Sequence, residues 1–394
     1  MQRITTQERL TRLARRHRLA PSTWSGDPAE AARSLVGYHG TDPASVYLQA
    51  RARTADLTQT GLQRALYEAR SLVRLIGMRR TLFVVPTELL PVVHAAASRA
   101  IAARERGRLV AMVREAAIAV EPTTWLESVE AATMAALAAH EEPVAAATLS
   151  AEVVGLRERV AVGSGRWAGS MSVATRLLMV LAMEGRIVRA PPRGTWISGQ
   201  YRWAPAARWL GGDLLQLPTD AAQADLIERW LRGFGPGTER DLAWWTGLPL
   251  GAVRRALARL ATAEVTLDDG TTGLVLEADR EPDPPTEPWI ALLPALDATV
   301  MGWQARDWYL GPHSPALFDT SGNAGPTVWA GGRIVGGWSQ RQDGTVVVRL
   351  LEDPGRDARL AIDAEAAALA AWIGHIRVVP RFRTPLEAEL VAAG

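Results

Sequence analysis

Apolar residues recur at helical spacing through the first seventy residues and then give way to a short apolar run. A capping box at Thr5–Glu8 opens the first, basic helix. Asp42 and Pro43 suit the N-cap and first position of a third helix. The pattern predicts helices over 5–18, 28–37, from 43 onward, and over 61–73, with a strand at 80–85. Helices followed by a short β element are typical of a winged helix.

A similar order of elements recurs twice further along the chain. Long Ala-rich helical segments over 87–120 and 122–139 come first and predict a linker bundle. The next unit is expected to contain helices over 150–160 and 170–183 and a hairpin of 186–189 with 194–198. A third unit has helices over 221–232, 238–246 and 250–263, with a hairpin around Asp268-Asp-Gly270. Its stretch 238–257, with Gly247 in the turn, is a good helix-turn-helix pattern.

The chain becomes β-rich after a linker of Pro, Glu and Asp at 279–288. Short strands are expected at 291–297, 327–329, 333–335 and 345–351, and a closing helix at 364–373. The pattern therefore predicts an α+β protein, mainly α, with three tandem winged-helix units and a small C-terminal β domain. The expected division is winged helix 1 with the polar turn at 1–86, a helical linker at 87–142, winged helix 2 at 143–205, winged helix 3 at 206–280 and the β domain at 289–394.

Composition excludes several kinds of chemistry. Cysteine is absent from the 394 residues, which removes disulfides and thiolate catalysis and fits a reducing cytoplasm. Lysine is absent too, which removes Schiff-base chemistry through a lysine side chain. The six histidines are scattered without metal-ligand spacing, so we expect no metal site and no cofactor. No apolar stretch of membrane-spanning length occurs, and we expect no membrane contact.

The net charge of +2 conceals an asymmetry along the chain. Residues 1–110 contain 18 Arg against 8 Asp and Glu, whereas residues 111–394 contain 26 Arg against 34 acids. A basic first domain favours a polyanionic partner, because the arginine fork matches phosphate oxygens. A solvated helical face is the competing explanation for the same charge.

A short turn between Leu35 and Pro43 concentrates side chains able to hold a water or move a proton. These are His39, Thr41 and Asp42, and they are the candidate catalytic residues. A neutral imidazole can accept a proton, and a threonine hydroxyl can share a water. For Asp42, the role of helix N-cap is a stronger interpretation than that of supplying negative charge to the reaction. His39 also has a structural interpretation, as a histidine that hydrogen-bonds the turn.

Arginines near this turn and in the expected recognition helices are the candidate DNA contacts. Such side chains position a protein on the phosphate backbone and do not read sequence. Surface solubility is the alternative role for each of them. The candidates are Arg51, Arg53, Arg79, Arg80, Arg176, Arg254, Arg255 and Arg333.

Several motifs together resemble the winged-helix DNA glycosylase family typified by AlkZ, whose relatives include YcaQ. They are the 35–43 turn, Met78-Arg-Arg-Thr-Leu82, Leu293-Pro-Ala-Leu-Asp297, Arg306-Asp-Trp308 and Gly331-Gly-Arg-Ile-Val-Gly-Gly-Trp338. The resemblance implies a C-shaped protein around duplex DNA that excises bulky N7-alkylated purines in base excision repair, and we expect a monomer. Members linked to antibiotic producers give self-resistance to alkylating natural products. A cytoplasmic, nucleoid-associated protein is the corresponding expectation.

The resemblance fails at the centre of the turn. The family has Gln-x-Gln or Gln-x-Asp there, whereas this chain has His39 and Thr41, and the family's usual His is replaced by Phe83. The altered turn still suits a monofunctional glycosylase. An N7-alkylated guanine is already cationic and leaves without a strong acid, so a water at C1′ is what remains to be positioned. A winged-helix DNA-binding regulator and a non-catalytic adduct-binding paralogue are the alternatives.

Overall fold

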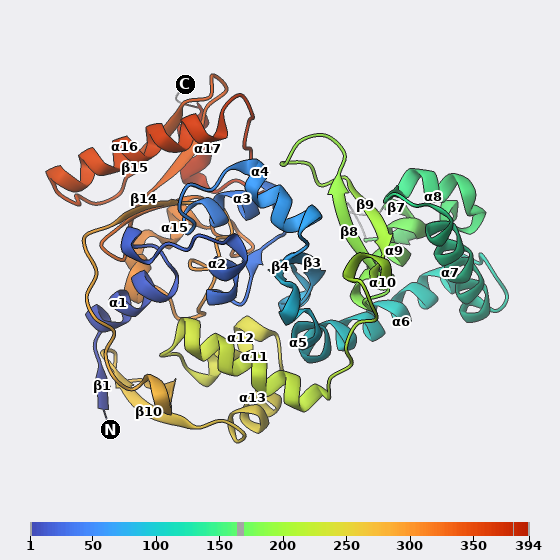
Figure 1. Ribbon diagram of the computed structural model, residues 1–394, viewed down its shortest axis with the longest axis horizontal. Coiled ribbons are helices and arrows are strands. Elements are labelled where there is room, and N and C mark those ends of the chain that lie inside the picture. Colours follow the sequence, from blue (N-terminus) through green and yellow to red (C-terminus); the bar gives the residue numbers. More distant parts are fainter. Residues whose placement is uncertain (1, 164–168, 381, 393–394) are drawn as a thin grey trace.

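The computed structural model describes residues 2–163, 169–380 and 382–392, and it has the expected mixed α+β architecture (Figure 1). Its first unit is built on a three-stranded sheet in the order β2-β4-β3. Predicted helices at 5–18, 28–37 and from 43 are confirmed, with Thr5 and Asp42 as N-caps of the first and third. The elements are α1 (Thr6–Arg16), α2 (Pro28–Ser34), β2 (Tyr38–His39), α3 (Pro43–Arg51), α4 (Gln59–Gln63), a π-helical turn (Arg64–Glu68), β3 (Leu72–Ile76) and β4 (Leu82–Pro86).

The helix expected to run to residue 73 is wrong at its C-terminal end. Arg70 has a φ of 54°, which ends the helical path, and Leu72–Ile76 forms the strand β3. All five residues of β3 are buried. A continuous apolar run of this length does not distinguish a buried strand from a helix by periodicity alone. Arg79 and Arg80 also have positive φ and form a tight turn before β4, so the expected strand begins two residues later.

A long helical connection leads to the second unit. It comprises a 3-10 turn (Thr87–Leu89), α5 (Leu90–Val93), a π-helical turn (His94–Ser98), α6 (Arg99–Glu115) and α7 (Pro122–Ala139). The second unit contains β5 (Val144–Ala145), α8 (Ala146–Glu152), a 3-10 turn (Val154–Arg157), β6 (Arg159–Val162), β7 (Gly169–Ser172), α9 (Val173–Met183), β8 (Ile187–Pro192), β9 (Tyr201–Pro205) and α10 (Ala206–Leu210).

Three expectations for the second unit are wrong, and the first concerns the helix expected from residue 170, because residues 170–172 belong to β7 and α9 begins at Val173. Residues 159–162 form a strand that pairs with β7 instead of continuing a helix to residue 160. The hairpin pairs β8 with residues 201–205, whereas 194–198, expected as its second strand, lies in the connecting loop. Trp196 in that loop is buried against Tyr47 of α3, with ring centroids 5.1 Å apart. Its apolar character therefore serves packing between units instead of strand pairing.

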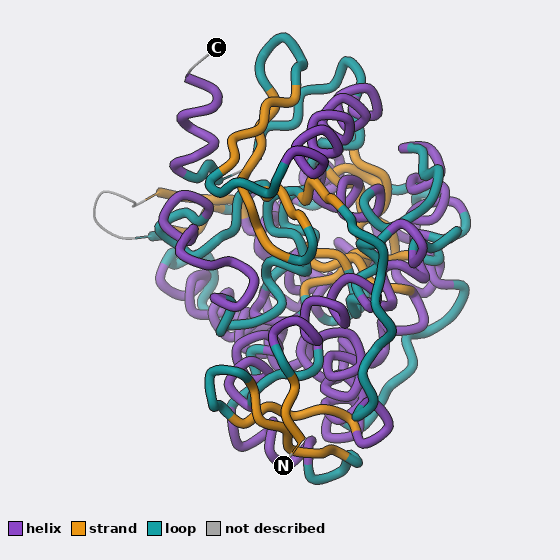
Figure 2. The backbone as a smooth tube through the Cα atoms, turned by 90° about the vertical axis from the view of Figure 1, so that its left-hand side faces the viewer, coloured by secondary structure: helices purple, strands orange, loops and turns teal. Residues whose placement is uncertain are grey.

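The third unit takes one strand from the other end of the sequence. It contains α11 (Thr219–Phe234), α12 (Glu239–Thr246), α13 (Leu250–Leu257), β10 (Thr262–Leu267), β11 (Thr272–Leu276) and a 3-10 turn (Glu277–Asp279). The expected hairpin is confirmed, and a capping box at Thr238 and Asp241 starts α12. The N-terminal strand β1 (Gln2–Ile4) pairs in parallel with β10 (Figure 2). This strand was not predicted, because the three residues Gln2–Ile4 directly before α1 are too few to show an alternating pattern.

The C-terminal unit is a four-stranded sheet in the order β12-β13-β14-β15 with helices packed on it. Its closing helix begins eight residues earlier than expected, and a last helix was not predicted. Its elements are β12 (Ile290–Leu293), α14 (Asp307–Leu310), a 3-10 turn (Gly311–His313), α15 (Ser314–Leu317), β13 (Thr327–Ala330), β14 (Arg333–Gln340), β15 (Val346–Leu350), α16 (Arg356–Ile373) and α17 (Pro385–Ala392).

One apolar core joins the first, third and C-terminal units and reaches the β8–β9 hairpin. A separate core lies among α6, α7, α8 and α9. The candidate turn is therefore held by elements from distant parts of the sequence. Within the described ranges, no helix combines the length and apolarity needed to cross a membrane. The division of the chain into domains remains a prediction.

Candidate active site

The candidate turn joins the edge strand β2 to the start of α3. His39 pairs with Phe83 of β4, and the amide of Gly40 donates to the carbonyl of Leu82 at 2.6 Å. Asp42 then caps α3, because its Oδ1 accepts from the amide of Ala44 at 3.0 Å. The turn is thus fixed to the sheet on one side and to a helix on the other.

The side chain of Gln49 clamps the turn from the next helical turns of α3. Its Oε1 accepts from the amide of His39 at 3.2 Å, and its Nε2 donates to the His39 carbonyl at 2.9 Å. The same amide group bonds the Ser45 carbonyl at 3.1 Å and the Ala298 amide at 3.1 Å. Gln49 is 0 % exposed, so these bonds replace water for every group involved. The backbone of the turn is therefore tied to the C-terminal unit.

A buried ion pair extends this clamp. Arg53 donates to Asp297 through both terminal nitrogens, at 2.9 and 2.7 Å, and both side chains are 0 % exposed. Arg53 also bonds the Gln49 carbonyl at 2.9 Å and the Thr299 hydroxyl at 2.8 Å. His17 of α1 contacts the same hydroxyl at 2.8 Å. The network joins α1, α3 and the segment after β12.

The imidazole of His39 lies inside the protein. The residue is 4 % exposed, and its ring centroid is 5.4 Å from that of Phe83. Burial, together with the charge of Arg79, lowers the pKa of His39 to about 3. The ring is therefore neutral at physiological pH and cannot act as an acid there. Its Nδ1 has no hydrogen-bond partner among the described residues.

Thr41 is the most accessible of the three candidate side chains. It is partly exposed, whereas His39 and Asp42 are buried. Asp42 borders a cavity of 10 Å³ that it shares with Glu387 and residues of the C-terminal sheet. That volume suits about one water molecule. Burial raises the pKa of Glu387 to about 7, despite its bonds to Thr384.

The two adjacent arginines before β4 lie in different environments. Arg79 lies over the ring of Trp244, with its guanidinium carbon 4.1 Å from the ring centroid. Burial and the charge of Arg306 lower the pKa of Arg79 to about 10, which leaves it charged at neutral pH. Arg80 forms an ion pair with Glu105 at 3.0 Å. Arg79 therefore keeps its charge close to His39 of the turn, whereas the charge of Arg80 is partly neutralised by Glu105.

The expectation that Arg53 contacts DNA requires correction. Its guanidinium is enclosed and paired with Asp297, so it stabilises the fold and is not available to a phosphate. Arg51 lies nearby on α3 and pairs with Glu365 of α16 at 2.6 Å. It is largely buried in this contact between the first and C-terminal units.

The remaining DNA-binding candidates lie on α9, α13 and β14. Arg176 pairs with Glu105 at 3.6 Å, and Arg254 pairs with Glu239 at 2.9 Å. Arg333 lies 3.9 Å from Glu352 and is half exposed. Arg255 is exposed on α13 and makes no ion pair with the described residues. A role for these four in DNA binding stays a prediction.

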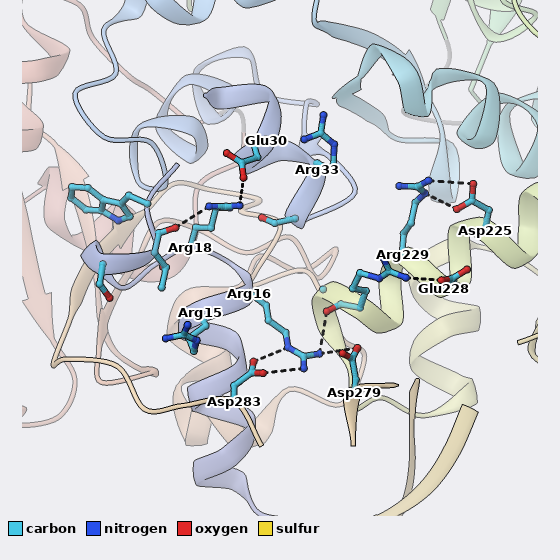
Figure 3. A pocket seen from close by; sticks show the side chains of 16 residues that line it. Arg15, Arg16, Arg18, Glu30, Arg33, Asp225, Glu228, Arg229, Asp279 and Asp283 are labelled. Atoms are coloured by element: carbon cyan, nitrogen blue, oxygen red, sulfur yellow. Dashed lines mark hydrogen bonds and ion pairs between the residues drawn. The ribbon is translucent and has the colours of Figure 1, made fainter. Parts of the chain in front are cut away.

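A wide cavity lies away from the turn (Figure 3). Its volume is 810 Å³, and α1, α2, α11 and the segment around 279–283 surround it. Acidic and basic side chains alternate on its walls and pair with one another, as Arg16 does with Asp283 at 2.8 Å and Arg18 with Glu30 at 2.7 Å. None of the three turn residues is part of its described lining. This cavity is a neutralised polar cleft and not a cationic groove.

The C-terminal motifs quoted from the sequence surround the turn. Ser45 of α3 donates to the carbonyl of Ala295 at 2.7 Å, and Trp338 donates through its indole to the carbonyl of Leu293 at 2.9 Å. Arg306 shares the ring of Trp244 with Arg79. These motifs therefore hold the turn and its neighbours in place. Sequence reasoning missed Gln49, which lies on α3 four residues before Arg53 in the turn after that helix.

The chain is similar to known proteins in its sequence family and in its fold. The family model described as "DNA glycosylase AlkZ-like" matches residues 32–372. No curated protein sequence matches the chain. Among solved structures, the DNA glycosylase AlkZ of Streptomyces sahachiroi has a similar fold, with a TM-score of 0.71 and 20 % identity over 95 % of this chain and 98 % of that one. Because the family model covers most of the sequence, including the turn and its clamp, this chain belongs to the AlkZ-like DNA glycosylase family.

Proposed function

We propose that this protein is a monofunctional DNA glycosylase that removes N7-alkylated purines, bulky adducts included, by attack of water at C1′. The observation that carries the proposal is the family match over residues 32–372, which contains both the turn and the residues that clamp it. A rigid backbone turn with a polar side chain at its surface suits the positioning of one water.

The protonation state of the turn supports this choice of substrate. A glycosylase that acts on a neutral purine must protonate the departing base, and His39, with a pKa of about 3, carries no proton to give at neutral pH. An N7-alkylated purine carries its positive charge already and needs no such donor. Among the described residues, the cavity that Asp42 borders has a volume of only 10 Å³, too small for a base, which favours a lesion handled at the protein surface.

Exposure changes the roles expected within the turn. Thr41 is partly exposed, so its hydroxyl is the group that can hold the attacking water, while the neutral His39 supports the turn from behind. Asp42 fixes the start of α3 through its N-cap bond. We therefore expect Thr41→Ala to lower the excision rate by about 100-fold, the lower end of what a positioned proton-transfer group supplies.

The test uses full-length protein and a panel of duplexes with one N7-alkylguanine, from a methyl to an intercalator-sized adduct. Released base and alkali-labile sites report excision, and a separate titration reports DNA binding. His39→Gln restores the family residue and should retain activity, and Thr60→Ala, an exposed threonine on α4, is the matched control. Undiminished excision by Thr41→Ala would reject the role given to Thr41.

The burial of His39 favours a second candidate function, that of a non-catalytic adduct-binding protein. Tight, adduct-selective binding without released base from any duplex of the panel would establish it. That result would also reject the proposed glycosylase activity.

A further inference from the structure

A cluster of buried cationic and phenolic groups lies between the first and second units. Arg74 projects from β3 and is 4 % exposed, and its guanidinium carbon is 5.0 Å from the ring centroid of Tyr201 on β9. Arg189 on β8 acts electrostatically on the same tyrosine, and its guanidinium carbon is 4.9 Å from the ring centroid of Trp203. Tyr47 of α3 and Tyr67 of the π-helical turn are electrostatic neighbours of Arg74.

Many polar atoms of this cluster lack a hydrogen-bond partner. Within the described part of the chain, no hydrogen bond of good geometry is made by Nε and Nη1 of Arg74, Nη1 of Arg189 or the hydroxyls of Tyr47, Tyr67 and Tyr201, although Tyr67 lies within reach of Arg74 and Tyr47 within reach of Gln63. Buried polar groups in folded proteins are normally hydrogen-bonded, so six unsatisfied atoms in one cluster require an explanation. All six can donate a hydrogen bond.

The cluster also lacks a counterion. Neither Arg74 nor Arg189 makes an ion pair with any described Asp or Glu, although most other buried arginines of the chain do. Asp42 acts electrostatically on Tyr201, and its Oδ1 accepts the N-cap bond of α3. Burial lowers the pKa of Arg189 to about 10, so it remains charged at neutral pH. An unpaired buried guanidinium is costly, and a bound anion would offset that cost.

We propose that Arg74, Arg189 and the three tyrosines form a binding site for a phosphate group. Guanidinium forks and phenol hydroxyls match phosphate oxygens, which accept several hydrogen bonds at once. Arg189, Tyr67 and Tyr201 are partly exposed as residues, whereas the six unsatisfied atoms are enclosed, so a phosphate would have to enter beside these three residues. The phosphate is either a phosphodiester of bound DNA, a source that rests on the proposed function, or free inorganic phosphate.

The place of the cluster fits a role beside the turn. Tyr47 lies on α3 one helical turn after Pro43, and a side chain added at Gly199, in the loop before Tyr201, would lie 3.9 Å from the ring of Pro43. A phosphodiester bound here would hold the strand next to the nucleotide that meets Thr41.

The first test is thermal unfolding of the full-length protein in inorganic phosphate and in chloride at matched ionic strength. A ligand that binds the folded state raises Tm in a saturable manner. We expect this shift for the wild type and for Arg202→Gln, which removes an exposed arginine next to Tyr201. Arg74→Met should weaken the apparent phosphate affinity about tenfold or more, as expected when charged hydrogen bonds are lost. Should this variant fail to fold, Tyr201→Phe keeps the ring and removes one donor.

The second test distinguishes the two sources. If the site holds a DNA phosphodiester, Arg74→Met lowers the slope of log Kobs against log salt by about 1 for an undamaged duplex. If it holds free phosphate, the slope is unchanged and the Tm shift alone is lost. Unchanged slope and unchanged Tm shift in both Arg74→Met and Tyr201→Phe would overturn the proposal. Neither measurement depends on excision, so a failure of the glycosylase activity is distinguishable from a failure of this site.

Discussion

Replacing Arg53 by Met tests the role that the structure gives to the buried ion pair. The guanidinium donates to both oxygens of Asp297, to the Gln49 carbonyl and to Thr299, and none of this surface is exposed. Arg53→Met leaves the carboxylate buried and unpaired. Breaking a buried ion pair from one side costs about 3–5 kcal/mol, a large part of the stability of an ordinary domain.

The double variant separates pairing from packing. In Arg53→Met with Asp297→Asn, no charge is left unpaired, and the Asn oxygen can still accept from the amide of Thr299, a bond of 2.8 Å in the wild type. We expect the double variant to recover at least about 1 kcal/mol relative to Arg53→Met alone, as contacting residues show coupling of this size.

Urea unfolding followed by tryptophan fluorescence measures these differences, and duplex binding at several salt concentrations serves as the second readout. Because the guanidinium is enclosed, the salt dependence of binding by folded Arg53→Met should equal that of the wild type. The reasoning would be refuted by a variant that keeps its stability but loses a unit of salt slope, since Arg53 would then be a phosphate contact.

Three further predictions concern the turn. The pKa of His39 in the folded protein, about 3, lies below its unfolded value, so its contribution to the free energy of unfolding is complete above about pH 6.5 and decreases as the pH falls. Urea unfolding should show a loss of about 2 kcal/mol from this source by pH 5, and His39→Gln should abolish that loss. Gln49→Leu leaves buried amides unsatisfied and should cost about 2–4 kcal/mol in the same assay, while a loss below 0.5 kcal/mol would argue against the clamp. Asp42→Ala should cost about 1 kcal/mol in thermal unfolding, whereas Asp42→Ser, which keeps a capping oxygen, should cost less.

The parts of the fold with local signals were predictable from the sequence. The caps at Thr5 and Asp42 and the turn at Asp268–Gly270 depend on residues close together in the chain, and the structure confirms all of them. Strand β3 was predicted as helix because its burial on both faces removes the alternation that marks a strand. Strand β1 was missed because its partner lies more than 260 residues away.

The site was less predictable than the fold. Residue types identified the turn, but they did not indicate that His39 faces the interior and Thr41 the exterior. That difference is set by Phe83 and Arg79, which arrive from another strand and another turn. Charge counting assigned Arg53 to DNA because its partner, Asp297, is not visible in the local sequence.

The pairing of Arg53 with Asp297 also determines when, during synthesis of the chain, the turn can reach its final structure. The two residues are 244 positions apart, and a ribosome adds about 5–20 residues each second, so the acid follows the base by roughly 12–50 s. Throughout that interval the guanidinium of Arg53 in the nascent chain has no Asp297 carboxylate with which to pair. The loop that would meet damaged nucleotides therefore acquires its final shape only after Asp297 has been added to the chain.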